Sequence, residues 1–465
     1  MSAGISIPRR DFIRLAAGAG MLSFLPSSLM ARQSGIQADP HFFLFIFIPG
    51  GMDPSYTFDA RSLEMTSANL QQNYLNAEPK LWRGLNANTT LCSSLVAPLL
   101  PFQNDFTILN GVLMDLGVDA HEQQTNKLLT GGPFGGDCIV PIIGSASDKK
   151  TPIDALQKGQ LYIESANMDR MVPLKPEAAY KLIRQFKAAK SDLFKRPSMN
   201  FMKSRLEVLS AQRENSFGNA VRLLGEGVEQ APEIINLIKK IRPELLLPRS
   251  HDQQDRTFLN LVTEMYRLGG TNAAVVNYDT HFALDCHDPA GAKNHPVVLK
   301  SCMQRVAETF SYLKSTPYDR KRSFWDVTTV MVASEFGRTM RQSGRSLDST
   351  GTDHNAFANS ILLGGKKIRG GQVIGNSDNQ KPDERLSRAH ERFDTKRIRA
   401  IGRPFNFESG LSRIDLPEEF DESGYLTMNS VINTLFSAFG VSNDLYLKVN
   451  GASSAKARVI KQILS

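Results

Sequence analysis

Carboxylate and imidazole side chains stand beside several apolar segments of this sequence, where they could bind a divalent metal ion. Imidazole nitrogens combined with carboxylate oxygens suit Zn or Mn, whereas a site of oxygen ligands alone would suit Mg or Ca. A metal ion acidifies a bound water molecule and stabilises negative charge, which is the chemistry that ester hydrolysis needs. The candidate metal ligands are Asp53, His121, Asp279, His281, Glu335, Asp353 and His354.

Glu335 and Arg338 are also the candidate catalytic residues. A guanidinium group can hold an anionic ester through two parallel hydrogen bonds, so Arg338 is the candidate for substrate binding. Each candidate has a structural interpretation as well. Arg338 could form a salt bridge with Glu335, and the acids and histidines could be ordinary surface or turn-capping residues.

The elements that would position these residues alternate between strands and helices. Apolar, β-branched or aromatic runs predict buried strands at 41–48, 106–111, 273–278, 327–333 and 360–363. Helical periodicity covers 297–313 and 428–439, and Gly440 follows as a helix C-cap. This alternation predicts an α/β fold, with a mostly parallel central sheet and helices on both faces. Because ligands bind beyond the carboxyl ends of parallel strands, the candidate residues are expected to converge there.

Three further segments complete the predicted organisation. Residues 1–31 resemble a twin-arginine signal peptide, with Arg9 and Arg10 before a short, weakly apolar run at 15–25. That run is too short for a permanent membrane span, so we expect a periplasmic or secreted protein that uses the twin-arginine export machinery. The α/β domain is predicted at 40–445, with a helical insertion or cap at about 175–245 and a C-terminal tail at 446–465.

The composition is that of a folded globular protein. The chain has 465 residues, of which 41% are hydrophobic and 22% charged. Its formal net charge is +8, but the basic residues are interleaved with 47 acidic ones, so no nucleic-acid partner is expected. None of the four cysteines forms a C-x-x-C pair and none lies among the candidate ligands, which argues against a thiolate metal site.

Several motifs resemble, in order and spacing, those of the bacterial family called domain of unknown function 1501. They are Asp-Thr-His at 279–281, Ser-Glu-Phe-Gly-Arg-Thr at 334–339, Gly-Thr-Asp-His at 351–354 and the glycine-containing run at 363–375. The resemblance spans roughly Phe42 to Gly440. That family looks like a branch of the alkaline-phosphatase and sulfatase superfamily. The resemblance therefore implies an alkaline-phosphatase-like fold and hydrolysis of phosphate or sulfate esters at one or two metal ions.

The resemblance also implies roles for individual residues. Asp53 matches the acidic metal ligand that follows the first strand, and Asp279 with His281 resembles the Asp and His that bind the other metal. His354, beside Asp353, resembles the late histidine ligand. The superfamily usually separates its Asp and His by more than one residue, so the Asp279 and His281 pair departs from the pattern.

Two positions depart further from the superfamily pattern. Glu335 falls where an Asp-His pair normally stands, and Phe336 occupies the histidine position. The superfamily places a Ser, Thr or modified Cys nucleophile nine residues before a Thr-Gly pair, and counting back from Thr130 reaches His121. A histidine is not the usual alkoxide nucleophile, but it could be a metal ligand.

The sequence therefore leaves two functions open. The leading hypothesis is an exported hydrolase of a small anionic phosphate, sulfate or related ester, with one or two divalent ions, Zn or Mn, that activate water for direct attack. The alternative is a secreted binding or structural protein that kept the fold and lost catalysis. His121 and Phe336, in place of the expected nucleophile and ligand, motivate that alternative.

Overall fold

The computed structural model describes residues 39–61, 79–118, 120–146, 151–159, 161, 163, 167, 170–173, 240–242, 254–339, 351–380, 399–413, 420–441 and 457–465. The chain divides into two compact units. The larger comprises Asp39–Ala146, Gly159–Met168 and Ala273–Ser465, and the smaller comprises Met1–Ala38, Ser147–Lys158 and Asp169–Asn272. The predicted signal peptide and nearly all of the predicted helical insertion lie outside the described residues.

A mixed sheet forms the centre of the larger unit. Its strands there, in spatial order, are β12 (Val373–Ile374), β4 (Phe106–Val112), β11 (Asn359–Gly365), β8 (Thr328–Ala333), β1 (Phe42–Phe47) and β7 (Ala273–Asn277). β1 pairs in parallel with β7 and β8, and β12 pairs in parallel with β4, whereas β11 is antiparallel to both β4 and β8. Every residue of β1 is buried, as expected for a central strand covered on both faces. The predicted α/β class with a mostly parallel sheet is confirmed.

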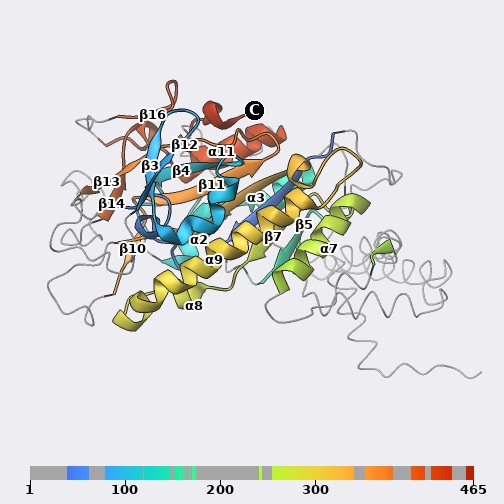
Figure 1. The fold of residues 1–465 in the computed structure, drawn as a ribbon, viewed down its shortest axis with the longest axis horizontal. Helices are drawn as coiled ribbons and strands as arrows, with labels where there is room; N and C mark the ends of the chain where they lie inside the picture. Colours follow the sequence, from blue (N-terminus) through green and yellow to red (C-terminus); the bar gives the residue numbers. More distant parts are fainter. Residues whose placement is uncertain are drawn as a thin grey trace, which may run out of the picture. The chain divides into compact units, whose positions relative to one another are not determined.

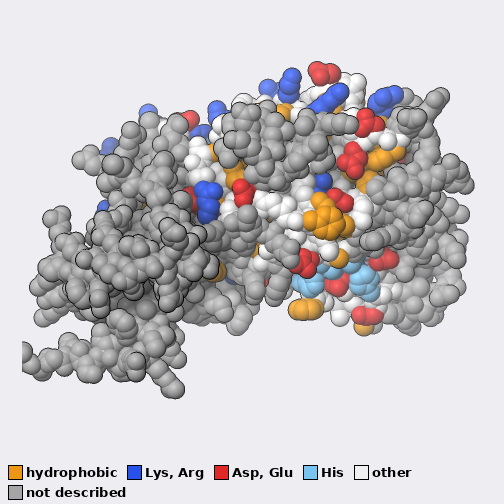
Figure 2. Space-filling view, turned by 180° about the vertical axis from the view of Figure 1, so that it is seen from behind, with side chains coloured by type: hydrophobic (Ala, Val, Ile, Leu, Met, Phe, Trp, Pro, Cys, Tyr) orange, Lys and Arg blue, Asp and Glu red, His pale blue; other side chains and the backbone are white. Residues whose placement is uncertain are grey.

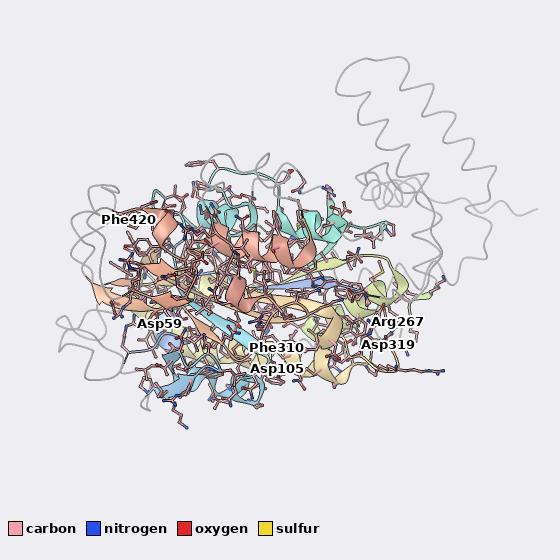
Figure 3. All side chains as sticks on the ribbon, turned by 90° about the horizontal axis from the view of Figure 1, so that it is seen from above. Asp59, Asp105, Arg267, Phe310, Asp319 and Phe420 are labelled. Atoms are coloured by element: carbon pink, nitrogen blue, oxygen red, sulfur yellow. The ribbon has the colours of Figure 1, made fainter. Side chains whose placement is uncertain are left out.

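Helices cover the sheet on both sides (Figure 3). They are α2 (His121–Thr130), α3 (Ile139–Ala146), α8 (His281–Leu284), α9 (Pro289–Ser315) and α11 (Met428–Phe439). α9 runs across the strands in Figure 1, and its residue Phe310 marks one side of the sheet in Figure 3. α9 starts earlier than predicted because Asp288 caps it by accepting a hydrogen bond from the Gly291 N–H. α11 has its predicted bounds and ends at Gly440, which adopts a left-handed conformation.

Short ladders and 3₁₀ helices make up the rest of the larger unit. The ladders pair β2 (Lys80–Arg83) with β3 (Thr89–Cys92), β9 (Gly337–Arg338) with β10 (His354–Asn355), β13 (Ser377–Gln380) with β14 (Arg399–Gly402), and β15 (Phe405–Asn406) with β16 (Leu411–Ser412). The 3₁₀ helices are η1 (Pro54–Tyr56), η3 (Ser94–Phe102), η8 (Trp325–Val327), η9 (Glu422–Gly424) and η10 (Lys461–Ile463). Ile460 and Ile463 are buried and Leu464 bridges to Ile368, so the end of the predicted C-terminal tail packs onto this unit.

The smaller unit contributes three described elements. β5 (Ala155–Lys158) and β6 (Met171–Pro173) are parallel, and α7 spans Gln254–Leu268. Lys158 of β5 forms an ion pair with Asp255 of α7. In the part of the chain that the structure describes, no helix combines the length and hydropathy needed to cross a membrane.

Because β11 is antiparallel to its neighbours, the loop that precedes it lies at the carboxyl edge of the sheet. The strands β1, β7, β8 and β4 run toward this edge, and segments with candidate site residues follow each of them. β11 runs the opposite way, with Asn359 at its start opposite Val112 near the end of β4. The residues before β11, which include His354, therefore lie at the same edge as the residues after the other strands.

Candidate metal centre

Three histidines and one aspartate of the larger unit place their donor atoms around a common point. The residues are His121, Asp285, His287 and His354, whose ligand atoms all lie within 4.8 Å of one another. Oδ1 of Asp285 is 3.0 Å from Nε2 of His287, 3.2 Å from Nε2 of His121 and 3.6 Å from Nε2 of His354. Nε2 of His287 is 3.0 Å from Nε2 of His354. We call these four residues the His₃Asp group.

The spacing within the His₃Asp group fits a tetrahedral metal ion. Ligand bonds of about 2.0–2.1 Å to Zn give a ligand-to-ligand distance of about 3.3 Å in a tetrahedron, and the four donor pairs given above are 3.0–3.6 Å apart. The donor atom of His121 lies within 4.8 Å of those of His287 and His354. Nε2 of His121 is buried and makes no directional hydrogen bond, although it is close to Asp285. A donor atom that is shielded from water and aimed at other donors is what a metal ligand requires before its ion binds. The residues present therefore fit a divalent cation.

Glu335 determines the orientation of His121. Oε1 of Glu335 lies 2.6 Å from Nδ1 of His121 and also accepts a hydrogen bond from the Gly50 N–H at 2.8 Å. Oε2 accepts a hydrogen bond from the hydroxyl of Ser334 at 2.8 Å. Because Nδ1 of His121 faces the carboxylate, Nε2 faces the other members of the His₃Asp group. This is the usual carboxylate–histidine arrangement that supports a metal ligand.

The Glu335 carboxylate is ionised although it is only 1% exposed. Burial opposes the charge, but the hydrogen bond and charge of His121, with backbone N–H groups, hold the pKa of Glu335 below its usual value. Both of its oxygens already have partners. Glu335 is thus placed to orient His121 rather than to contact a substrate.

Arg338 orients Asp285, as Glu335 orients His121. Its Nη2 donates to Oδ1 of Asp285 at 2.5 Å and to the carbonyl of Gly50 at 2.7 Å. Burial opposes ionisation of Asp285, but the hydrogen bond and charge of Arg338, with His121 and His287 nearby, keep its pKa well below the usual range. The Arg338 side chain has 0% exposure and meets Asp285 from the interior of the protein, and its predicted contact with an anionic ester stays a prediction. It positions Asp285.

A second group shares His121. His121, His281 and Glu335 also offer ligand atoms within 4.8 Å of one another. The ring of His281 meets the ring of His121 edge-on, with 4.3 Å between the centroids. Burial, followed by the charge of His121, lowers the pKa of His281 and favours its neutral form. Since Glu335 is fully engaged by hydrogen bonds, His281 is the member of this group that remains to contact a ligand.

Phe336 forms one wall of the His₃Asp group. Its ring stacks on the ring of His354 with 4.3 Å between centroids and lies 4.7 Å from the ring of His121. Phe336 is fully buried. The aromatic residue that replaces the histidine implied by the family resemblance therefore restricts the rotation of two candidate ligands.

The other predicted ligands lie outside both groups. Asp353 supports the His₃Asp group, because its Oδ1 accepts from the His354 N–H at 2.9 Å and lies 3.6 Å from Nδ1 of His287. Asp279 is exposed and has φ of 54°, in a turn closed by a hydrogen bond from its N–H to Asn277. Because β7 ends at Asn277 and α8 begins at His281, Asp279 and His281 do not share the face that an extended strand would give them.

Asp53 is buried beside the site but belongs to neither group. Oδ1 accepts two hydrogen bonds from Ser55, and Oδ2 is buried and has no hydrogen-bond partner among the described residues. Burial raises the pKa of Asp53 to about 7, against the lowering effect of the Ser55 hydrogen bonds and of Arg338. An acid with a raised native pKa stabilises the fold below its unfolded pKa of 3.8, and that stability is lost as the pH rises toward 7.

We therefore expect Asp53→Asn to become more stable relative to the wild type as the pH rises from 4 to 7. Asparagine keeps an acceptor for Ser55 and carries no charge to bury. The gain at pH 7 is expected to reach at most about 4 kcal/mol. Denaturant unfolding of the chelator-treated proteins at several pH values measures it, with the exposed Asp279→Asn as control. A difference between Asp53→Asn and the wild type that does not change with pH would contradict the assignment.

Asp285 and His287 were missed by the sequence interpretation. They form a second Asp-x-His pattern, at 285–287, six residues after the first. Spacing alone gives both patterns equal weight, and the family motif at 279–281 favoured the first. The two patterns differ in their position relative to α8, which begins soon after β7. Asp285 and His287 follow α8, and that position places them at the site.

Part of the His₃Asp group is accessible to solvent. The side chain of His287 is 48% exposed, and Figure 2 shows histidine side chains gathered on one face with acidic side chains close to them. Phe282, the neighbour of His281 on α8, is 94% exposed. The exposed part of the site is therefore the His287 side of the His₃Asp group, whereas Nε2 of His121 is buried.

Fold and site together define an α/β protein with a histidine-rich candidate metal centre at the carboxyl edge of its sheet. Residues 280–393 match the family model described as "Protein of unknown function (DUF1501)", which confirms the predicted domain over that segment. The matched segment contains His281, Asp285, His287, Glu335 and His354. The resemblance inferred from the sequence was longer, from Phe42 to Gly440.

The other comparisons are weaker. A search of curated proteins found no significant match. Among solved structures, the crystal structure of the lipoteichoic acid synthase LtaP from Listeria monocytogenes aligns over 77% of this chain and 73% of that chain. The identity is 10% and the TM-score 0.31, so this similarity carries no conclusion about activity.

Proposed function

We propose that this protein is a metal-dependent hydrolase of a phosphate, sulfate or related ester, exported by the signal predicted at Arg9 and Arg10. The single observation that carries the proposal is the His₃Asp group, whose four donor atoms are spaced for one metal ion at a solvent-accessible edge of the sheet. Three imidazoles and one carboxylate favour Zn or Mn over Mg or Ca. When bound, such an ion supplies Lewis acidity, which acidifies water and stabilises negative charge.

Water is the proposed attacking group, because the described hydroxyls near the site are engaged elsewhere. Ser334 donates to Glu335, Thr125 donates to the carbonyl of His121, and Ser55 donates to Asp53. His121 holds the position where the family resemblance implies a nucleophile. Single displacement without a covalent intermediate follows from this arrangement.

The protein's own side chains would act in two ways. Glu335 and Arg338 hold His121 and Asp285 in place through the hydrogen bonds described above. His281, whose ring lies beside that of His121, is placed to accept a proton from the attacking water at an imidazole nitrogen. The sequence predicted Glu335 as a metal ligand and catalytic residue and Arg338 as a substrate-binding residue, and both are here proposed to position metal ligands instead.

A secreted binding or structural protein is the second candidate. The His₃Asp group supplies four protein ligands, which is the number found in closed structural sites, whereas catalytic Zn sites usually have three protein ligands and one open position. Catalysis here would require the ion to accept a fifth ligand. If all four residues bind the ion, the arrangement favours a binding or structural protein over a hydrolase.

Metal analysis combined with an ester panel tests the proposal. We expect the purified protein to contain about one Zn or Mn ion per chain in the His₃Asp group. Chelation should abolish hydrolysis of an aryl phosphate, a phosphodiester or an aryl sulfate, and adding the metal back should restore it. A chiral phosphate ester should react with inversion at phosphorus. Retention would reveal a covalent intermediate, and inactivity of the metal-loaded protein across the panel would favour the binding protein.

A further inference from the structure

Cys286 lies between two members of the His₃Asp group in the chain and contacts the segment that carries a third. It is fully buried between Asp285 and His287. Its Sγ lies 2.9 Å from Oγ1 of Thr352, two residues before His354. The backbone adds a second connection, because the Thr352 N–H donates to the carbonyl of Cys286 at 2.8 Å.

The same sulfur also contacts α9. Nδ1 of His295 lies 3.2 Å from Sγ of Cys286 and 3.3 Å from the carbonyl of Leu284. His295 is 2% exposed, and burial lowers its pKa to about 3, so its ring is neutral. One histidine thus contacts the residues on either side of Asp285. We call Cys286, His295 and Thr352 the Cys286 cluster.

We propose that the Cys286 cluster is a positioning device that fixes segment 285–287 against segment 352–354 and so sets the spacing of the donor atoms in the His₃Asp group. Asp285 and His287 flank Cys286, whereas His354 belongs to the Thr352 segment. The contact between Cys286 and Thr352 therefore controls the 3.0 Å separation of Nε2 of His287 and Nε2 of His354. The inference rests on the metal centre of the proposed function.

Two glycines that lie close to backbone atoms show that these segments pack tightly against each other. A Cβ added at Gly351 would lie 2.0 Å from the carbonyl oxygen of His287, which is far inside van der Waals contact. A Cβ added at Gly291, in the first turn of α9, would lie 3.1 Å from Cα of Cys286. Backbone therefore packs closely against Cys286 on one side and against His287 on the other, so a change in the Cys286 side chain is expected to move segment 285–287.

Cobalt(II) is the probe for this inference, because it occupies tetrahedral histidine sites and its visible absorption reports ligand geometry. We expect Cys286→Ala to weaken cobalt binding by about 10- to 100-fold and to change the visible spectrum, since supporting contacts of metal ligands have effects of this size. Cys286→Ser keeps a polar partner for Thr352 and His295 and should restore much of the affinity. Cys92→Ala removes another buried cysteine, on β3, and should bind cobalt as the wild type does.

Thr352→Val provides a second variant that keeps the inference falsifiable if Cys286→Ala does not fold. It removes only the hydroxyl that contacts Sγ, and it should shift the spectrum in the same direction. The double variant should lose little more affinity than the more affected single variant, because both substitutions remove the same contact. Wild-type affinity and spectrum in Cys286→Ala, or additive losses in the double variant, would overturn the inference.

The outcomes separate this inference from the proposed activity. If the wild type binds no cobalt, the metal centre fails and the positioning role fails with it. If the wild type binds cobalt but hydrolyses no ester, only the hydrolase proposal fails. In that case the binding and spectral measurements still decide whether the Cys286 cluster positions the ligands.

Discussion

Asp285→Asn is expected to lower metal affinity on the order of 100-fold or more and to reduce ester hydrolysis to background. The carboxylate of Asp285 is the only anionic member of the His₃Asp group, and its Oδ1 lies within 3.6 Å of Nε2 of all three histidines. Asparagine keeps the shape but removes the negative charge that attracts the cation. Competition with a chromophoric chelator measures the affinity, and the ester panel measures the activity.

Asp279→Asn is the matched control for that experiment. It makes the same chemical change six residues earlier, at the acid that the sequence favours as a ligand and the structure places in an exposed turn. We expect its metal affinity and activity to equal those of the wild type. If instead Asp279→Asn loses the metal and Asp285→Asn keeps it, the His₃Asp group is not the metal centre.

Arg338→Met is expected to cost about 3–5 kcal/mol of unfolding free energy, even in the metal-free protein. The guanidinium is fully buried and links Asp285 to the carbonyl of Gly50, so its removal leaves a carboxylate and a carbonyl without their donor. Arg338→Lys keeps the charge but cannot reproduce the planar guanidinium with its several donors, and it should lose a substantial part of the same stability. Denaturant unfolding with and without chelator measures both variants.

This result separates a positioning role from direct substrate binding. If Arg338 held the substrate, Arg338→Lys would mainly raise KM and leave the metal-free stability unchanged. If it positions Asp285, stability and metal affinity fall together, and KM changes less than kcat. An unaltered unfolding free energy in Arg338→Met would contradict the positioning role.

The sequence predicted five strands of the central sheet closely, because each is a largely apolar run with no competing helical pattern. β1, β4, β7, β8 and β11 all lie within one or two residues of their predicted positions. The sequence did not reveal that β11 is antiparallel. Strand direction depends on which neighbours a strand finds in the folded sheet, and β11 inserts between β4 and β8. His354 reaches the site only because of this reversal.

The ligand set was harder to predict than the fold, for a local reason. Asp279 and His281 were predicted as a pair of ligands, but the chain leaves the strand at Asn277 and turns through a left-handed Asp279 into α8. A two-residue spacing indicates a shared face only in extended backbone. Asp285 and His287 have the same spacing, and both lie in the His₃Asp group with buried Cys286 between them.

The pairing of β1 also has a consequence for how the protein is made. Phe45 at the middle of β1 pairs with Val275 on one side and with Met331 on the other. At about 5–20 residues per second, a ribosome needs roughly 15–60 s to extend the chain from Phe45 to Met331. Until Val275 is made, after roughly 12–46 s, the segment Phe42–Phe47 has neither of its strand partners. A short, uncharged, aromatic run of this kind is prone to aggregate while unpaired, so translation speed and chaperone access should limit the yield of folded protein more than final stability does.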